Sequence, residues 1–234
     1  MNKETNQEDM FFNGEADNYF ERNKEHLLDK ERNTTDIPIL RMIETYSLNP
    51  KKVLDIGCGN GYVLNKIYEK YGSRCVGVEP GKKAIIHGTK NFPKIKIKRG
   101  LAYDLPINET FDIVILNYVF HWISRQKLFK SISEIDRVLK DGGYIIIGDF
   151  MPDYPTKNHY HHKEGFTYKL DYSALFTASA LYTQVCRMTY RHLSIKQPTS
   201  EGINHQNRMA YILLRKSSSE FYSEEVFVKP NEQK

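Results

Sequence analysis

The chain has 234 residues, 40% of them hydrophobic, and a formal net charge of +5 at pH 7. This length fits one α/β domain with elaborations, and the hydrophobic content is enough for a sizeable core. The modest positive charge does not require nucleic acid as a partner, and the first 36 residues are acidic rather than basic. The charge mildly favours an anionic small-molecule partner.

The cysteines and the chain start indicate a cellular setting. Cys58, Cys75 and Cys186 have no CxxC spacing, which argues against a disulfide framework and against a zinc site, so we expect no metal. The N-terminus lacks the basic start and long apolar run of a signal peptide, and no stretch approaches 18 apolar residues. We therefore expect a cytoplasmic chain with no membrane partner; these features say nothing of its oligomeric state.

Two helical stretches, residues 19–28 and 38–46, precede an alternation of short apolar runs and longer helical segments. Runs of five or six residues separated by helices of about ten residues predict βαβ units around a parallel sheet. We expect its strands at residues 52–56, 74–78, 95–99, 111–116 and 144–148. The helices among them are expected at residues 62–71, 82–90 and 125–139.

The alternation ends at residues 150–190, which are rich in Phe, Tyr and His. We expect a helix over residues 174–185 within this segment. Two later strands, residues 188–196 and 208–216, are expected to form an antiparallel hairpin. The polar start of the chain, residues 1–14, is expected to be loosely ordered.

The most informative segment is VLDIGCGNG, residues 53–61, where the first predicted strand gives way to a helix. Gly57, Gly59 and Gly61 let the backbone turn sharply and approach a ligand closely. Their spacing differs from the dinucleotide fingerprint GxGxxG, whose third glycine comes one residue later. Asp55, at the end of the strand, adds a carboxylate that can face a ligand ammonium.

Glu79 ends the next predicted strand, in the segment CVGVEP. Ligands of open α/β sheets bind outside the carboxyl ends of the strands. An acid in this place can accept hydrogen bonds from both hydroxyls of a ribose, as in nucleotide-binding sheets. Glu79 is therefore the second candidate binding residue.

Five segments, VLDIGCGNG, CVGVEP, GLAYDLP, FDIVILNYVFHWI and RVLKDGGYIII, occur in the order and spacing of class I S-adenosylmethionine (SAM)-dependent methyltransferases. The chain most resembles the large subfamily, methyltransferase type 11, that methylates small molecules, and the resemblance covers residues 51–149. It implies a Rossmann-like seven-stranded, mostly parallel sheet with helices on both faces, an antiparallel final strand and a helical or loop cap. It also implies SAM as the cofactor.

The resemblance assigns a role to each motif residue at the methionyl end of the cofactor. Asp55 and the glycine-rich loop match the part that holds the methionyl group. Asn117 matches the position where a backbone carbonyl meets the methionyl ammonium. The loop residues concerned are Gly57, Cys58, Gly59 and Gly61.

The resemblance also assigns the adenosine end. Glu79 matches the acid that binds the ribose, and Pro80 is expected beside the adenine. Ala102 and Tyr103 match the backbone that reads the adenine edge. This chain departs from the family at Leu101, where an aspartate often accepts the adenine amino group. Asp104 can take over that contact, or the contact is lost.

Four histidines, His121, His159, His161 and His162, are candidates for a general base, because unperturbed histidines titrate near neutrality. For His121 a hydrogen-bonded residue at the start of a helix is the favoured interpretation. The other three histidines are expected either to contact the acceptor or to belong to a polar loop. Trp122 is expected to pack rather than to react.

The acceptor is expected to be small and polar, anionic or sugar-like, and methylated on oxygen or nitrogen. No nucleic acid is expected, since the fourth strand lacks an Asn/Asp-Pro-Pro-Tyr motif. We expect the chain to be organised in five parts. They are a helical segment packing near the cofactor (1–50), the SAM-binding core (51–149), an acceptor-binding cap (150–190), strands completing the sheet (191–216) and a flexible tail (217–234).

Two other kinds of protein compete with this interpretation. A nicotinamide-dependent oxidoreductase is disfavoured by the glycine spacing and by the lack of a Tyr-x-x-x-Lys pair after the fourth strand. A non-catalytic SAM-binding protein would carry the same motifs and stays open.

Overall fold

The computed structural model describes residues 7–28, 36–192, 198–199 and 204–217. Seven strands form one sheet in the order β3-β2-β1-β4-β5-β9-β8. The first five run parallel, whereas β9 is antiparallel to both of its neighbours, β5 and β8. This arrangement confirms the predicted fold. The strands are β1 (Lys52–Ile56), β2 (Arg74–Glu79), β3 (Lys96–Arg99), β4 (Phe111–Asn117), β5 (Leu139–Phe150), β8 (Tyr182–Arg191) and β9 (Arg208–Lys216).

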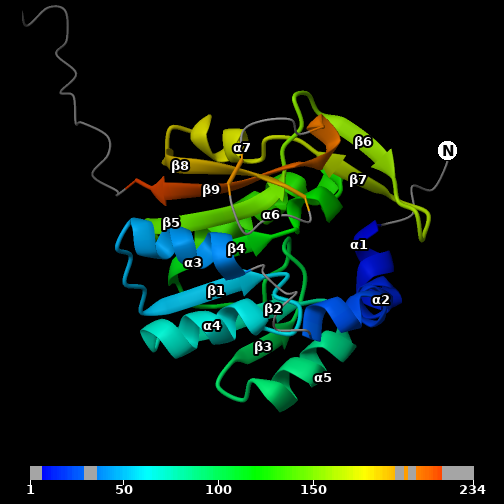
Figure 1. The fold of residues 1–234 in the computed structure, drawn as a ribbon, viewed down its shortest axis with the longest axis horizontal. Coiled ribbons are helices and arrows are strands. Elements are labelled where there is room, and N and C mark those ends of the chain that lie inside the picture. Colours follow the sequence, from blue (N-terminus) through cyan, green and yellow to red (C-terminus); the bar gives the residue numbers. More distant parts are fainter. Residues whose placement is uncertain (1–6, 29–35, 193–197, 200–203, 218–234) are drawn as a thin grey trace, which may run out of the picture.

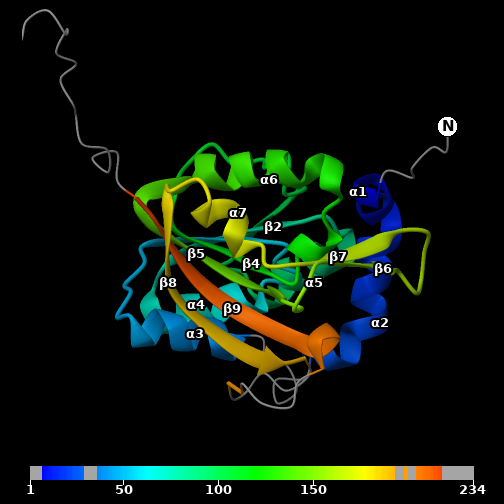
Figure 2. The same ribbon diagram turned by 90° about the horizontal axis from the view of Figure 1, so that it is seen from above.

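Helices cover both faces of the sheet (Figure 2), because each is apolar on one side. Buried side chains of α3 and α4 join one hydrophobic cluster with the sheet, and those of α6 and α7 join the other. The helix α5 lies against β2 and β3. The helices are α3 (Asp36–Thr45), α4 (Tyr62–Tyr71), α5 (Lys82–Asn91), α6 (Arg125–Val138) and α7 (Ser173–Thr177), with 3-10 turns η2 (Phe120–Trp122) and η3 (His205–Asn207).

The start of the described chain is helical, which differs from the loose order expected for residues 1–14. It consists of α1 (Gln7–Met10), the π-helical turn η1 (Phe11–Glu15) and α2 (Ala16–Leu28), with a kink at Gly14. In Figure 1 these elements lie at the end of the sheet toward which β1 points. The prediction was wrong for residues 7–14, because tertiary packing orders a segment whose composition is polar. Residues 1–6 lie outside the described part.

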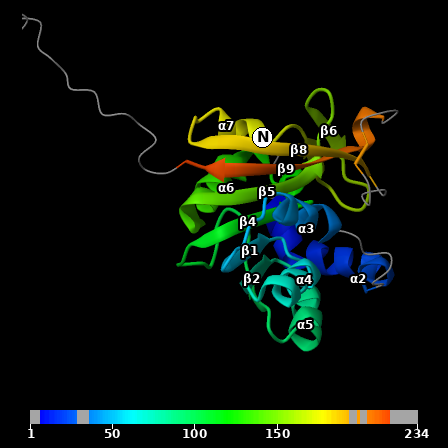
Figure 3. The ribbon, with the colours of Figure 1, turned by 60° about the vertical axis from the view of Figure 1, so that its left-hand side comes forward.

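The segment after β5 also differs from the prediction. The expected helix over residues 174–185 is wrong: α7 ends at Thr177, Ala180 takes a left-handed φ of 61°, and β8 starts at Tyr182. The strand forms because its ladder with β9 supplies backbone partners along its whole length. Figure 3 shows β9 between β5 and β8.

Two further differences concern the predicted cap. The strand β8 lies at the edge of the main sheet, so it is not part of a separate insertion. A small hairpin that the sequence did not predict, β6 (Thr156–His159) with β7 (Phe166–Lys169), forms a second sheet. The predicted strand over residues 188–196 begins six residues too late, and its end at 193–196 and the tail at 218–234 lie outside the described residues.

Gly88 of α5 marks the closest approach of a helix to the loop after β1. A Cβ added there would overlap the carbonyl oxygen of Asn60 and the side chain of Ile97. Overpacking against a backbone atom costs about 1–3 kcal/mol, more than the roughly 1 kcal/mol that alanine adds to a helix.

We therefore expect Gly88→Ala to lower the free energy of unfolding by about 1 kcal/mol in urea titrations, the middle of the overpacking range less the gain in helix propensity. Thr89→Ala, a substitution on the exposed side of the same helix, is the matched control and should be neutral or slightly stabilising. Equal stability of the two variants would contradict the close packing of α5 on the loop.

Candidate functional site

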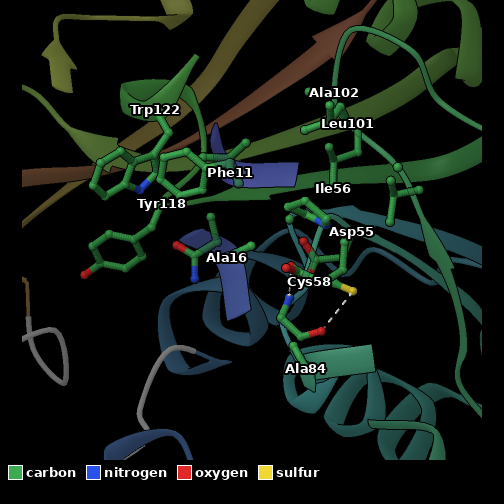
Figure 4. Close-up of a pocket in the computed structure, with 18 of the residues that line it drawn as sticks. Phe11, Ala16, Asp55, Ile56, Cys58, Ala84, Leu101, Ala102, Tyr118 and Trp122 are labelled. Carbon is green, nitrogen blue, oxygen red and sulfur yellow. Dashed lines mark hydrogen bonds between the residues drawn. The ribbon is translucent and has the colours of Figure 1, made fainter. Parts of the chain in front are cut away.

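A cavity of about 240 Å³ opens where β1, β2 and β4 end, and α1, η1 and α2 form its opposite wall. Figure 4 shows Phe11 and Trp122 together on one side of it and Leu101 and Ala102 together on another. This is the edge at which open α/β sheets bind ligands. The strand ends contribute polar groups, and the helices contribute aromatic rings.

The loop after β1 approaches the cavity with its backbone. Gly57, Gly59 and Gly61 have φ values of 75°, 55° and 79°, in the left-handed region that favours glycine. A Cβ at Gly57 would overlap the side chain of Val119. The amides of Gly57 and Cys58 both donate to the carbonyl oxygen of Val78, at 2.7 and 3.2 Å, which ties the loop to the end of β2.

Two buried carboxylates lie at the floor of the cavity. Asp55 Oδ1 is buried and has no hydrogen-bond partner among the described residues. Burial, and then the charge of Glu79, hold the pKa of Asp55 well above its ordinary value. A buried carboxylate without partners is costly unless a ligand supplies a donor or a positive charge. Asp55 is therefore placed to receive such a ligand group.

The Glu79 carboxylate links two loops. Its Oε2 accepts from the amide of Gly59 at 2.9 Å, and its Oε1 accepts from the amide of Gly81 at 2.8 Å. Burial raises its pKa to about 7, against the opposing effect of these two hydrogen bonds, and Asp17 raises it further. Each carboxylate oxygen accepts more than one hydrogen bond, so Glu79 can still accept from a ligand.

The chain turns over the cavity just after β4. Tyr118 has a left-handed φ of 59°, which is uncommon for a residue other than glycine. Its amide donates to the carbonyl oxygen of Gly148 at 2.7 Å, which fixes the turn. Asn117, Tyr118 and Trp122 consequently line the cavity from this side. Strained backbone of this kind concentrates at functional sites.

A tight turn after β3 forms the far end of the cavity. Leu101, Ala102 and Tyr103 line it, together with Pro80 from the loop after β2. The amide of Asp104 donates to the carbonyl oxygen of Leu101 at 3.1 Å, and the Asp104 side chain is exposed. Asp104 and Gly61 do not line the cavity, whereas the other cofactor-binding candidates do.

His121 is buried behind the cavity and does not line it. Its Nδ1 lies 2.8 Å from Asp149 Oδ1, and its amide donates to Asp149 Oδ2 at 3.2 Å. The ring also meets Phe150 edge-on, with centroids 5.2 Å apart. The pair holds η2, and with it Trp122, in place. The geometry favours the reading of His121 as a hydrogen-bonded residue at a helix start over that of a base.

The other three histidine candidates also lie away from the cavity. His159, His161 and His162 are exposed on the β6–β7 hairpin, and none of them lines the cavity. The catalytic assignment to these side chains therefore has no support in the geometry. The neighbouring Tyr160, which directly follows β6, is instead half-buried and contacts Glu15 and Trp122.

Tyr160 joins the hairpin to the N-terminal helices. Its hydroxyl donates to Glu15 Oε1 at 2.6 Å, and Arg22 donates to the same oxygen at 2.5 Å. Its ring lies 4.7 Å from that of Trp122, which in turn lies 4.9 Å from Phe11. Phe11 and Trp122 line the cavity opposite the strand ends, and Tyr160 packs against Trp122 without lining it.

Sequence reasoning did not single out the residues that the N-terminal helices contribute. Glu8, Phe11, Ala16, Tyr19 and Phe20 line the cavity. The available signal was the apolar pair Phe11-Phe12 inside a polar stretch, which composition alone averages away.

The cavity lining is acidic. Glu8, Asp55 and Glu79 belong to it, and no Lys, Arg or His does within the described residues. No group of three potential metal ligands occurs in the same part of the chain. A search of these residues also found no helix with the length and apolar character needed to cross a bilayer.

Comparisons with known proteins agree with this geometry. Residues 54–147 match a family described as a methyltransferase domain. A solved structure, the 1,6-didemethyltoxoflavin-N1-methyltransferase of Burkholderia thailandensis, superposes with a TM-score of 0.66 at 14% identity, covering 92% of this chain and 91% of that one. The fold is therefore that of class I methyltransferases. Residues 54–147 are therefore similar to the methyltransferase domain of that family.

Curated proteins with sequence similarity to the chain include methyltransferases. An uncharacterised methyltransferase of Alkaliphilus oremlandii is 32% identical over 98 residues, which are 42% of this chain and 45% of that protein. The ubiquinone/menaquinone biosynthesis C-methyltransferase UbiE of Campylobacter jejuni is 27% identical over 197 residues, 80% of this chain and 71% of that protein. The match spans about half the length of two such relatives, the Alkaliphilus protein and an uncharacterised methyltransferase of Synechocystis.

The raised pKa of Glu79 predicts how stability depends on pH in the ligand-free protein. Its pKa rises from an ordinary value of 4.5 to about 7 in the fold, so folding favours the protonated acid. The resulting stabilisation, about 3 kcal/mol, is complete below the unfolded pKa and is lost as the pH rises through 7. We expect the stability of the wild type relative to Glu79→Gln to fall between about pH 5 and pH 8.

Urea unfolding at intervals across this range measures the effect. The quantity to follow is the difference in unfolding free energy between the wild type and Glu79→Gln, plotted against pH. Its absolute size is not used, because the substitution itself alters the hydrogen bonds to Gly59 and Gly81. A difference that stays constant, or that grows as the pH rises, would contradict the raised pKa.

Proposed function

We propose that the chain binds SAM in this cavity and transfers its methyl group to a small-molecule acceptor. The observation that carries the proposal is the convergence of the glycine loop, Asp55 and Glu79 on one cavity at the carboxyl edge of the sheet. The family match over residues 54–147 supports the same conclusion. The bound S-adenosylhomocysteine named for the Burkholderia neighbour, which shares the fold, adds to this support.

The residues of the cavity fit each part of SAM. Asp55, with its unpartnered oxygen, suits the methionyl ammonium, and the glycine loop leaves room for the methionyl chain. Glu79 suits the ribose hydroxyls, and the turn at Ala102 suits the adenine edge. A lining with three carboxylates and no described basic residue also suits a ligand that carries an ammonium and a sulfonium.

The aromatic wall indicates the acceptor. Phe11, Trp122 and Tyr118 present ring surfaces to the cavity, which suits a flat, uncharged ring better than the anionic or sugar-like acceptor expected from the sequence. The carboxylates of the cavity would repel an anionic acceptor, and the described lining has no positive charge to balance it. The Burkholderia neighbour, whose ligand is 1,6-didemethyltoxoflavin, is an N-methyltransferase, and so is NodS of Bradyrhizobium japonicum. We keep nitrogen or oxygen as the methylated atom.

Positioning supplies the catalysis in this proposal. Bound SAM would supply a methyl group on a sulfonium. The acceptor lone pair would form the new bond to carbon as the carbon–sulfur bond breaks, the electron pair of that bond would stay on sulfur, and a proton carried by the acceptor atom would pass to solvent. Holding the acceptor in line with that methyl turns a bimolecular displacement into an effectively unimolecular step. Phe11, Tyr118 and Trp122 would exclude water and orient the acceptor ring, and Tyr160 would support Trp122 from outside the cavity. No histidine is needed at the reacting atoms.

We place the enzyme in the cytoplasm, without a nucleic-acid substrate.

Calorimetric titration of the full chain tests the binding step. We expect SAM and S-adenosylhomocysteine to bind with micromolar affinity, and NAD(H) to bind far more weakly, since the glycine spacing does not suit a pyrophosphate. Tight NAD(H) binding without SAM binding would overturn the proposal. SAM binding without methyl transfer to any of a panel of heteroaromatic acceptors would favour a non-catalytic SAM-binding protein.

Glu79→Ala tests the ribose contact. Loss of hydrogen bonds to a charged acceptor costs about 1.5–3 kcal/mol each, so we expect the affinity for S-adenosylhomocysteine to fall at least about tenfold at pH 8. Glu44→Ala removes an exposed carboxylate from α3, outside the cavity, and should leave the affinity unchanged. An equal affinity of Glu79→Ala and the wild type would show that another group holds the ribose.

A further inference from the structure

The adenine end of the cavity lacks an acid in the usual place. Leu101 occupies the position where related sequences often have an aspartate for the adenine amino group. Asp104, the nearest substitute in sequence, has an exposed side chain and does not line the cavity. If adenine binds at the Leu101–Tyr103 turn, its amino group needs an acceptor from another element, because a buried donor without a partner is costly.

Glu8 of α1 is a buried carboxylate in the same cavity. It is 6% exposed, and it lines the cavity together with Leu101, Ala102 and Tyr103. Its Oε1 accepts from the amide of Ser124 at 2.8 Å, its single hydrogen bond within the part of the chain that the structure describes. One oxygen is thus anchored, and the carboxylate keeps further acceptor capacity.

The electrostatics of Tyr103 place Glu8 near this turn. Burial raises the pKa of the Tyr103 phenol most, and the carboxylates of Asp9, Glu8 and Asp104 raise it further. Asp9 and Asp104 are exposed. The remaining acids of the cavity, Asp55 and Glu79, lie together at the strand ends. Of the three described acids that act on Tyr103, Glu8 is the one that lines the cavity.

The neighbouring residue holds α1 in register. Gln7 Nε2 donates to the carbonyl oxygens of Trp122, at 2.6 Å, and Phe166, at 2.8 Å. Gln7 Oε1 accepts from the amide of Phe166 at 3.0 Å. With the Glu8–Ser124 bond, these contacts fix the helix to η2 and to β7, so the Glu8 carboxylate has a defined position.

We propose that Glu8 accepts a hydrogen bond from the exocyclic amino group of the bound adenine, in place of the aspartate that Leu101 replaces. This inference rests on the proposed SAM binding. It makes the N-terminal helix part of the cofactor site, and it makes Glu8 the residue that selects adenine over a purine with an oxygen at the same position. The carboxylate accepts a hydrogen bond from the amino group of adenine. It repels a carbonyl oxygen at the same position, because both groups are acceptors.

The test compares two ligands that differ at this position, S-adenosylhomocysteine and its deaminated analogue S-inosylhomocysteine. Each is titrated calorimetrically into the wild type, Glu8→Gln and Asp9→Asn. The glutamine can still accept from Ser124 through its oxygen, and its amide can donate to the inosyl oxygen. Asp9→Asn removes an equal charge from the adjacent exposed residue and is the matched control.

We expect the wild type to prefer the adenosyl ligand at least about tenfold, because a mismatched buried acceptor pair costs one or more hydrogen bonds. Glu8→Gln should reduce that preference at least about fivefold, whereas Asp9→Asn should leave it within about twofold. The inosyl ligand also carries a proton on the neighbouring ring nitrogen, but this difference affects all three proteins alike. A change in the adenosyl-to-inosyl affinity ratio between the proteins therefore reports on the contact with the amino group.

Two readouts separate this contact from a structural role and from the proposed function. Trp122 is the single tryptophan and packs on Phe11, so an unchanged emission maximum in Glu8→Gln shows that α1 and η1 stay in place. With emission unchanged, a preference equal to that of the wild type overturns the role of Glu8 while SAM binding stands. Failure of the wild type to bind S-adenosylhomocysteine overturns the proposed function, and this inference with it.

Discussion

The burial of two carboxylates at one edge of the sheet is the constraint on which the site depends. Glu79 accepts from the amides of Gly59 and Gly81, and so fastens the loop after β1 to the loop after β2. Asp55 lies close enough for the Glu79 charge to raise its pKa. Both acids lie in a lining without described cations, so they disfavour the empty state and favour a ligand with donors and positive charge.

The sequence predicted the part of the protein in which local pattern and packing agree. The alternation of apolar runs and helices gave β1 and α4 their observed bounds, and the remaining parallel strands overlap their predicted positions. The residues at the strand ends, Asp55 and Glu79, followed from the rule that parallel strands present their carboxyl ends at one edge. A short strand and the turn after it are local features, so one sequence is enough to find them.

The wall opposite the strand ends was not predictable in this way. Phe11 and Tyr160 are about 150 residues apart in sequence and meet at Trp122 only through the tertiary fold. Histidine-rich composition pointed to the β6–β7 hairpin, but Tyr160 contacts Trp122 there, whereas His159 and His161 are exposed. The helix expected over residues 174–185 overlaps the start of β8, where pairing with β9 forms a strand instead.

The position of β9 has a consequence for how the chain assembles. The last strand lies between β5 and β8, so β8 is synthesised first but reaches the sheet only through β9. Until β9 has left the ribosome, β5 is an open edge and β8 is a strand without a neighbour, and such edges pair readily with other chains. The five parallel strands can form early, whereas sheet closure must wait for Arg208–Lys216. Shielding of the β5 edge during synthesis is therefore a requirement that this strand order imposes on the cell.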